Sequence, residues 1–376
     1  MYITTKAGER HANMSLDDLW FGDDAKEYRG LITSNQTGTI TRRGNLYSAP
    51  PANTYAMTVS LSIFNEKYKE LMERDRHSLY NTFYIPKSSG GLRRIDAPND
   101  ELMAALRELK TIFELKFGAR WLYHTSAFAY IRNRSTIDCV KKHQLNKSKW
   151  FGKFDLHNFF GSSTMEFVMR MLENVYPFAS LVMTTLGRAT LEAALSLCFL
   201  DGVLPQGTPM SPMLTNIMMI PFDYHMEQEC RARNLVYTRY ADDFLISSRD
   251  QFMFRDVEAL IKDQLDRICA PFNLNTQKTR YGSANGANWN FGVMLNKDNQ
   301  ITIGRAKKRQ FESMLYAYSK DKKNGVNWSL EDVQRLAGLA SYYKMVEGDV
   351  ITRIIHHVSE KQGVDITAEM KRDLRS

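Results

Sequence analysis

The sequence lacks the long apolar runs and repeated small residues that mark membrane-spanning, fibrous and low-complexity chains. No stretch approaches the roughly 20 apolar residues that cross a bilayer as a helix, and the first ten residues have no apolar core of the kind a signal peptide needs. Only 21 glycines and 10 prolines occur in 376 residues, which excludes collagen-like and mostly disordered chains. We therefore expect a cytoplasmic protein without a membrane partner.

Cysteine is also scarce. The residues Cys139, Cys198, Cys230 and Cys269 form no CxxC pair and no zinc-ligand spacing, so we expect reduced, mostly structural thiols. With 43% hydrophobic and 24% charged residues, the composition is that of an ordinary globular protein. A chain of this length can build a large core and more than one lobe.

Positive charge is in excess and is unevenly distributed. The net charge is +8, and the segment 276–323 alone holds ten Lys and Arg residues against three acidic ones. A basic face of this size suits a polyanion, because neutralised phosphates release their condensed counterions. The alternative is a solvated helical surface, so charge alone does not decide the function.

The apolar pattern and the turn residues predict an α+β fold. Apolar residues recur at helical spacing over 60–79, and a helix is predicted again over 101–117. Residues 81–98 are typical of two short strands joined by a Ser-Ser-Gly-Gly turn. Later in the chain, two β-rich runs predict a hairpin whose tip carries Asp242 and Asp243. Because hairpins and helices are mixed, α+β is favoured over a wound parallel sheet.

Further helices are predicted from their first turns and apolar spacing. Ser163 and Glu166 stand at capping-box spacing ahead of apolar residues, and Pro212 suits the first turn of a helix that opens near Ser211. Helical patterns then follow over three C-terminal segments: 305–320, 328–345 and 349–361.

The paired acids of the hairpin are the first candidates for chemistry. Adjacent carboxylates repel each other unless a cation lies between them, and Asp155 ends an earlier predicted strand. Mg²⁺ prefers carboxylate oxygens together with substrate phosphates. Two such ions about 4 Å apart can activate an attacking hydroxyl and stabilise a leaving oxygen. The alternative is a solvated Asp-Asp turn, which many proteins contain.

Three segments in one order carry a resemblance to a known family. They are Phe154-Asp155-Leu-His-Asn-Phe-Phe160, Gln206-Gly-Thr-Pro-Met-Ser-Pro212 and Tyr240-Ala-Asp-Asp243. In this order they resemble palm motifs A, B and C of the reverse transcriptases. Residues 81–98 resemble the fingers segment of the bacterial members, residues 274–279 the motif D lysine segment, and Phe291-Gly292 the primer grip that precedes the thumb.

The resemblance spans roughly residues 60–345 and implies a right-hand polymerase of the bacterial retron-like or defence-associated group. Where retron enzymes carry an Asn-Ala-x-x-His motif, residues 139–143 keep only the histidine, His143. The implied domains follow one another along the chain: an extension of unknown role over 1–58, fingers over 59–150, palm over 151–303 with a helical insertion around 176–200, and a helical thumb and tail over 304–376.

The resemblance also implies roles for individual residues. Asp155 and Asp242 would be the principal ligands of two Mg²⁺ ions, with Mn²⁺ as an alternative metal, and Asp243 would be a weaker ligand. Lys278 would protonate the leaving pyrophosphate. The residues implied to contact the nucleotide are Lys87, Arg93 (or Arg94 if the register slips), Phe160 as the steric gate, Gln206, Gly207 and Tyr240. The thumb residues expected to bind nucleic acid are Arg305, Lys307, Lys308 and Arg309.

The function implied is RNA-directed DNA polymerisation in a retron-like or antiphage defence system. The partners are an RNA template, a nucleic-acid primer and deoxynucleoside triphosphates, and a cognate non-coding RNA is a further candidate. Two alternatives stay open: a template-independent or RNA-synthesising nucleotidyl transferase on the same scaffold, and a non-catalytic RNA-binding scaffold. The sequence leaves the natural template, the primer and the oligomeric state open.

Overall fold

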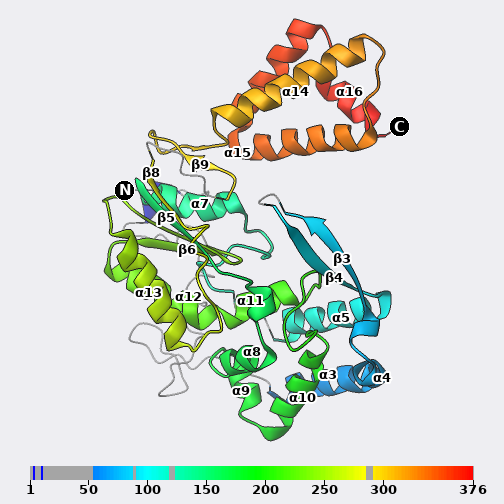
Figure 1. Ribbon diagram of the computed structural model, residues 1–376, viewed down its shortest axis with the longest axis vertical. Coiled ribbons are helices and arrows are strands. Elements are labelled where there is room, and N and C mark those ends of the chain that lie inside the picture. Colours follow the sequence, from blue (N-terminus) through cyan, green and yellow to red (C-terminus); the bar gives the residue numbers. More distant parts are fainter. Residues whose placement is uncertain are drawn as a thin grey trace. The chain divides into compact units, whose positions relative to one another are not determined.

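A computed structural model describes residues 54–87, 90–117, 123–284 and 291–375, together with the short strands β1 (Ile3–Thr4) and β2 (Arg10–His11) (Figure 1). Most of the predicted extension over 1–58 lies outside the described residues. The chain divides into two compact units. The first comprises Met1–Ser135, Gly152–Ser247 and Phe252–Arg280, and the second comprises Thr136–Phe151, Ser248–Gln251 and Tyr281–Ser376.

Helices with a shared core form one part of the first unit. They are α3 (Thr54–Lys67), α4 (Lys69–Glu73), α5 (Asp100–Lys116), α8 (Met165–Leu172), α9 (Phe178–Val182) and α10 (Thr185–Ser196). Leu61 and Phe64 of α3 are buried in the same core as Leu195 of α10. Asn99 begins α5, because its side-chain oxygen accepts a hydrogen bond from the Leu102 amide at 2.9 Å.

The start of α8 corrects the predicted capping box. The capping side chain is Thr164, whose hydroxyl accepts from the Phe167 amide at 3.2 Å. The Ser163 hydroxyl instead donates to the Phe159 carbonyl at 2.7 Å, closing the short 3₁₀ turn η2 (Phe160–Ser162). The helix therefore begins one residue later than the sequence pattern indicates, because Ser163 belongs to the preceding turn.

The predicted hairpin over 81–98 is confirmed as a two-stranded antiparallel ribbon. Strands β3 (Tyr80–Pro86) and β4 (Leu92–Pro98) pair from Tyr80 with Pro98 to Pro86 with Leu92. Residues 81–86 of β3 are all exposed, as are the first three residues of β4. The ribbon therefore offers side chains to solvent on much of its surface.

A four-stranded sheet carries the predicted acidic hairpin. Its strands lie in the order β6 (Val236–Tyr240), β7 (Asp243–Ser248), β5 (Trp150–Asp155) and β8 (Arg280–Ser283). Tyr240 pairs with Asp243, so Ala241 and Asp242 form a tight turn between β6 and β7. Three helices accompany the sheet strands in the chain: α11 (Ser211–Met218), α12 (Ile220–Ala232) and α13 (Phe254–Arg267), with α12 packed on β6 and α13.

The second unit is mostly helical and has a core of its own. Its elements are α7 (Thr136–Leu145), β9 (Met294–Leu295), β10 (Ile301–Thr302), α14 (Arg305–Lys323), α15 (Leu330–Gln362) and α16 (Ile366–Asp373). Figure 1 shows α14, α15 and α16 as a group of helices, and Phe311, Leu336 and Ile366 are buried between them.

The helices predicted over 328–345 and 349–361 form one helix, α15, with a kink at Glu347. The backbone of Glu347 is non-helical, with φ −140° and ψ 61°. Its carboxylate accepts from the Ile303 amide at 2.8 Å, the Thr302 hydroxyl at 2.9 Å and the Lys308 ammonium at 2.6 Å. These contacts from β10 and α14 hold the kink, and they come from residues too distant in sequence for a local pattern to reveal.

Candidate active site

The sheet places Asp155, Asp242 and Asp243 at the same edge. Asp155 is the last residue of β5 and Asp243 is the first residue of the neighbouring strand β7. The two strands are joined at this edge by a hydrogen bond from the Leu156 amide to the Asp242 carbonyl, 3.0 Å long. Residues that lie far apart in the sequence therefore present their carboxylates to a common region.

The three carboxylates influence one another electrostatically. Burial raises the pKa of Asp242, and the nearby Asp155 carboxylate raises it further. Burial also raises the pKa of Asp243 to about 6, while Lys153, whose ammonium lies 3.0 Å from the Asp243 carboxylate, opposes the increase. Such shifts show that the chain by itself does not fully stabilise negative charge at this edge.

Asp155 has one incompletely paired oxygen. Its side chain is buried, and the Lys278 ammonium lies 3.0 Å from Oδ1 and donates a hydrogen bond to Oδ2 at 3.2 Å. Oδ1 itself is buried without a hydrogen-bond partner. An unsatisfied carboxylate oxygen beside two other acids suits a hard divalent cation, which takes oxygen ligands.

In the arrangement observed, no three Asp, Glu, His or Cys side chains among the described residues converge closely enough to enclose a metal ion. Two of the three acids are paired with lysines instead. A bound cation would therefore compete with Lys153 and Lys278 for the same carboxylates. The donor atoms fit Mg²⁺ or Mn²⁺, since they are carboxylate oxygens whose ionised form is made unfavourable by burial and by one another.

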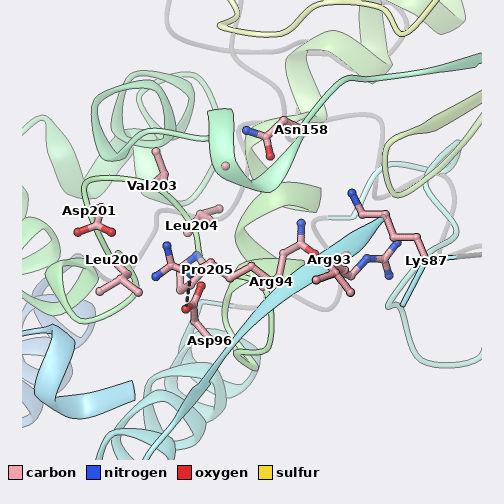
Figure 2. A pocket seen from close by; sticks show the side chains of 13 residues that line it. Lys87, Arg93, Arg94, Asp96, Asn158, Leu200, Asp201, Val203, Leu204 and Pro205 are labelled. Carbon is pink, nitrogen blue, oxygen red and sulfur yellow. Dashed lines mark hydrogen bonds and ion pairs between the residues drawn. The ribbon is translucent and has the colours of Figure 1, made fainter. Parts of the chain in front are cut away.

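A pocket of about 300 Å³ lies beside the β3–β4 ribbon (Figure 2). Its lining includes three basic residues from the ribbon and its turn, and polar groups from two other segments: Lys87, Arg93, Arg94, Asn158 and Gln206. The wall between them is formed by Leu200, Asp201, Val203, Leu204 and Pro205. A pocket with this concentration of cationic and amide donors is suited to a polyanionic group such as a triphosphate.

The basic residues of the pocket differ in their partners. Arg94 donates to the buried Asp96 carboxylate at 2.8 Å, the pair marked by the dashed line in Figure 2. Among the residues that the structure describes, Lys87 and Arg93 have no ion pair, and both side chains are exposed. Figure 2 shows these two side chains together, away from the Arg94–Asp96 pair. Lys87 and Arg93 are therefore available to a ligand, whereas Arg94 is largely held by the fold.

Gly207 explains how Gln206 reaches this pocket. The Gln206 carbonyl accepts from the Asp96 amide of β4 at 2.8 Å. Gly207 has φ +120°, and a Cβ there would lie 2.9 Å from the Asp96 carbonyl oxygen. Only glycine allows this close approach of the two backbones. Gly207 is thus a positioning residue in this structure and is not one of the pocket-lining residues, unlike Gln206.

Phe160 and Tyr240 lie close to the acids in the chain without lining the pocket. The Phe160 ring is half-buried and packs edge-on against Phe159, with 5.8 Å between ring centroids. Tyr240 closes the hairpin opposite Asp243 and is also half-buried. The steric-gate assignment of Phe160 therefore stays a prediction.

Asn158 is a pocket residue that the sequence did not single out. It follows Asp155 closely, has the left-handed φ of +47° and is exposed. Its side chain also fills the space where a Cβ at Gly161 would lie, 2.7 Å from the nearest amide atom. The signal was present in the sequence only as an Asn-x-x-Gly spacing within the turn after β5, which does not by itself indicate a ligand contact.

The four basic residues predicted for nucleic-acid binding begin α14 in the second unit. Arg305 and Arg309 are exposed, whereas Lys307 donates to the Gly292 carbonyl at 2.8 Å and Lys308 to Glu347 at 2.6 Å. Arg305 and Arg309 are therefore better suited to contact a phosphate backbone. Lys307 and Lys308 serve partly to hold α14 to neighbouring segments.

Comparison with known proteins gives the class of the protein. Residues 85–313, more than half of the chain, match the profile of the family described as reverse transcriptase (RNA-dependent DNA polymerase). The α+β fold with antiparallel sheets is that of a right-hand polymerase, and the family activity is that of a nucleotidyltransferase. The chain belongs to the reverse transcriptase family, and its activity is RNA-directed DNA polymerisation. The family resemblance inferred from the order of the motifs is thereby confirmed.

Several curated relatives are retron enzymes. The chain is 27% identical to the retron Ec83 reverse transcriptase of Escherichia coli over 73% of this chain and 85% of that protein. It is 26% identical to the retron Ec73 reverse transcriptase of the same species, over 72% and 84%. It is 28% identical to the retron Mx65 reverse transcriptase of Myxococcus xanthus, over 80% and 68%. Among solved structures, apo telomerase from Candida tropicalis aligns with a TM-score of 0.42 at 14% identity, covering 85% of this chain and 67% of that chain.

In the described part of the chain, no helix is both long enough and apolar enough to cross a membrane.

Proposed function

We propose that this reverse transcriptase synthesises cDNA by two-metal nucleotidyl transfer, with Asp155 and Asp242 as the principal metal ligands and Asp243 as a weaker one. The observation that carries the proposal is the common sheet edge of the three acids, where the buried Asp155 Oδ1 accepts no hydrogen bond and is offset by the ammonium of the exposed Lys278, 3.0 Å away. Divalent metals, when bound there, would offset the repulsion between the acids and the incoming triphosphate and favour ionisation of a primer hydroxyl.

The residues around this edge would position the reactants. Lys87 and Arg93 would hold the triphosphate, which is supported by their exposure and by the lack of an ion pair to either among the described residues. Gln206 would contact the nucleotide from the opposite wall. Phe160 would exclude a ribonucleotide 2′-hydroxyl. Lys278, whose exposed side chain pairs with Asp155, would donate a proton to the leaving pyrophosphate.

The proposed domains follow the family scheme of fingers over 59–150, palm over 151–303 and thumb over 304–376. In the thumb, Arg305 and Arg309, assisted by Lys307 and Lys308, would follow the phosphate backbone of an RNA–DNA hybrid by its shape and charge. The template would be RNA, and the similarity to retron enzymes supports a cognate non-coding RNA and a retron-like or antiphage defence role.

The Asp242→Asn variant tests the metal assignment most simply. We expect it to lower the rate of deoxynucleotide incorporation on a primed RNA template by about 10³-fold or more, because a transition-state charge loses its stabilisation. Affinity for the primed template should change less than twofold. Asp250→Asn is the matched control, since Asp250 is an exposed residue just after β7.

Retained synthesis by Asp242→Asn would contradict the assignment. The same assay without template, or with ribonucleotides, separates template-independent and RNA-synthesising activity from cDNA synthesis. Admission of ribonucleotides by Phe160→Ala would support the steric gate.

A further inference from the structure

A fully buried ion pair lies directly behind the acidic turn. Arg239 of β6 and Asp223 of α12 are both 0% exposed. The Arg239 guanidinium donates from Nε to Asp223 Oδ1 at 2.8 Å and from Nη2 to Oδ2 at 2.7 Å. The Tyr237 hydroxyl also donates to Oδ1, at 2.7 Å. Since an isolated buried pair seldom stabilises a fold more than apolar residues would, its geometry calls for a second explanation.

The remaining guanidinium nitrogen points to that explanation. Nη1 of Arg239 donates to the Ala241 carbonyl at 3.2 Å and to the Asn216 side-chain oxygen at 3.1 Å. Ala241 has φ +58°, a left-handed conformation that non-glycine residues seldom adopt without support. Ala241 immediately precedes Asp242. The guanidinium therefore holds the strained residue that sets the position of this carboxylate.

The same network reaches a second left-handed residue. Asn216 of α11 donates to the Ala129 carbonyl at 2.8 Å, and Ala129 precedes Tyr130, whose φ is +61°. The backbone of Arg239 pairs with the same loop: its amide donates to the Ser126 carbonyl at 2.6 Å, and its carbonyl accepts from the Phe128 amide at 2.9 Å. The loop before Tyr130 is therefore tied to β6 and α11.

Tyr130 lies within electrostatic range of the acidic turn. The residue is 57% exposed, yet partial burial of its hydroxyl raises its pKa, the nearby Asp242 and Tyr240 raise it further, and Arg93 opposes the increase. Asp242 thus follows the left-handed Ala241, Tyr130 is itself left-handed, and the buried network of Asp223, Arg239 and Asn216 holds the backbone at both places.

We propose that Arg239 is a positioning residue for DNA synthesis: anchored by Asp223, it fixes the Ala241 turn and, through Asn216, the Tyr130 loop, and so sets Asp242 against the nucleotide site. The proposal rests on the role of Asp242 proposed above. A guanidinium is required because its planar fork of N–H groups donates hydrogen bonds to Asp223, Asn216 and the Ala241 carbonyl at the same time.

The Arg239→Lys variant tests this requirement. Lysine keeps a positive charge for Asp223, but one ammonium cannot reach all three acceptors. We expect the rate constant kcat on a primed RNA template to fall at least tenfold, with less than a twofold change in template affinity. Mn²⁺ affinity, measured by electron paramagnetic resonance, should fall at least threefold. The control is Leu195→Ala, which opens the same unit's core at a fully buried residue of α10 that takes no part in the network's hydrogen bonds. Assayed below both unfolding temperatures, the control should keep kcat within twofold.

A second variant keeps the proposal testable if Arg239→Lys does not fold. Asn216→Ala leaves the Asp223–Arg239 pair intact and releases the Ala129 carbonyl, so kcat should fall at least threefold. Its matched control is Asn65→Ala, which removes a bond of 2.9 Å to the Thr190 carbonyl between α3 and α10. The proposal is overturned if the network variants keep kcat and Mn²⁺ affinity within twofold of their controls while Asp242→Asn is inactive. Activity in Asp242→Asn would instead overturn the metal assignment itself.

Discussion

Asp223 and the acidic pair Asp242–Asp243 lie near the same end of strand β6, but they differ in how fully the chain pairs their charges. Asp223 accepts three hydrogen bonds, from Tyr237 and from two nitrogens of Arg239, and is completely buried. Asp242 and Asp243 have raised pKa values because burial and neighbouring acids are only partly offset by lysines. A charge whose partners are all supplied by the chain holds the fold together. A charge left incompletely paired is available for a ligand.

The same contrast recurs in the ribbon. Arg94 is paired with the buried Asp96, whereas its neighbour Arg93 is exposed and unpaired among the described residues. On α14, Lys308 is bound to Glu347 while Arg309 is exposed. Adjacent basic residues therefore differ in role: one forms an ion pair within the fold, and the next is exposed to a ligand. Substituting each residue in turn can distinguish the two roles.

The largest effect on stability is expected at Asp223. Asp223→Asn leaves the buried Arg239 guanidinium without its counter-charge, which should lower the free energy of unfolding by about 3–5 kcal/mol. Urea denaturation followed by circular dichroism measures this, with the exposed Asp250→Asn as a control expected to stay within about 0.5 kcal/mol. A loss below about 1 kcal/mol at Asp223 would remove the distinction between the two groups of aspartates.

Asp243→Asn should raise the free energy of unfolding, whereas Asp223→Asn lowers it. The folded-state pKa of Asp243 is raised from 3.8 to about 6, so its stabilising contribution is present below about pH 4 and is lost as the pH rises through 6. At pH 8 in EDTA, the variant should therefore be more stable than the parent by about 1–2 kcal/mol, and near pH 4 the two should unfold alike. Lys153, which loses its partner, is 27% exposed and can be hydrated. Thermal unfolding at the two pH values measures this, and destabilisation at pH 8 would contradict it.

A smaller effect should separate Arg93 from Arg94. Arg93→Ala should raise the KM for deoxynucleotides about tenfold, or about 1.4 kcal/mol, without changing the unfolding midpoint. Arg94→Ala should raise KM less and lower stability by about 1 kcal/mol, because it strips the buried Asp96 of a partner. Steady-state kinetics and urea unfolding of both variants make the comparison. Equal KM values would mean that the ion pair with Asp96 does not determine which arginine binds the triphosphate.

The features predicted from the sequence were those encoded locally. The Ser-Ser-Gly-Gly turn and the alternation around it specify the ribbon, and the β-rich runs around Asp242 specify the acidic hairpin. The features that escaped prediction depend on contacts between distant segments. Nothing near Arg239 in the sequence indicates Asp223 as its partner, and the need for glycine at 207 arises only because β4 lies against it. The kink of α15 at Glu347 likewise depends on donors that come from β10 and α14.

The most direct test of the central claim is a Mn²⁺ titration of the 376-residue protein, followed by electron paramagnetic resonance, alongside Asp155→Asn and Asp242→Asn. If the acids at the sheet edge bind the metal, the parent should bind Mn²⁺ saturably and each variant at least tenfold more weakly, while circular dichroism spectra stay unchanged. Equal Mn²⁺ affinity in the parent and both variants would contradict the account.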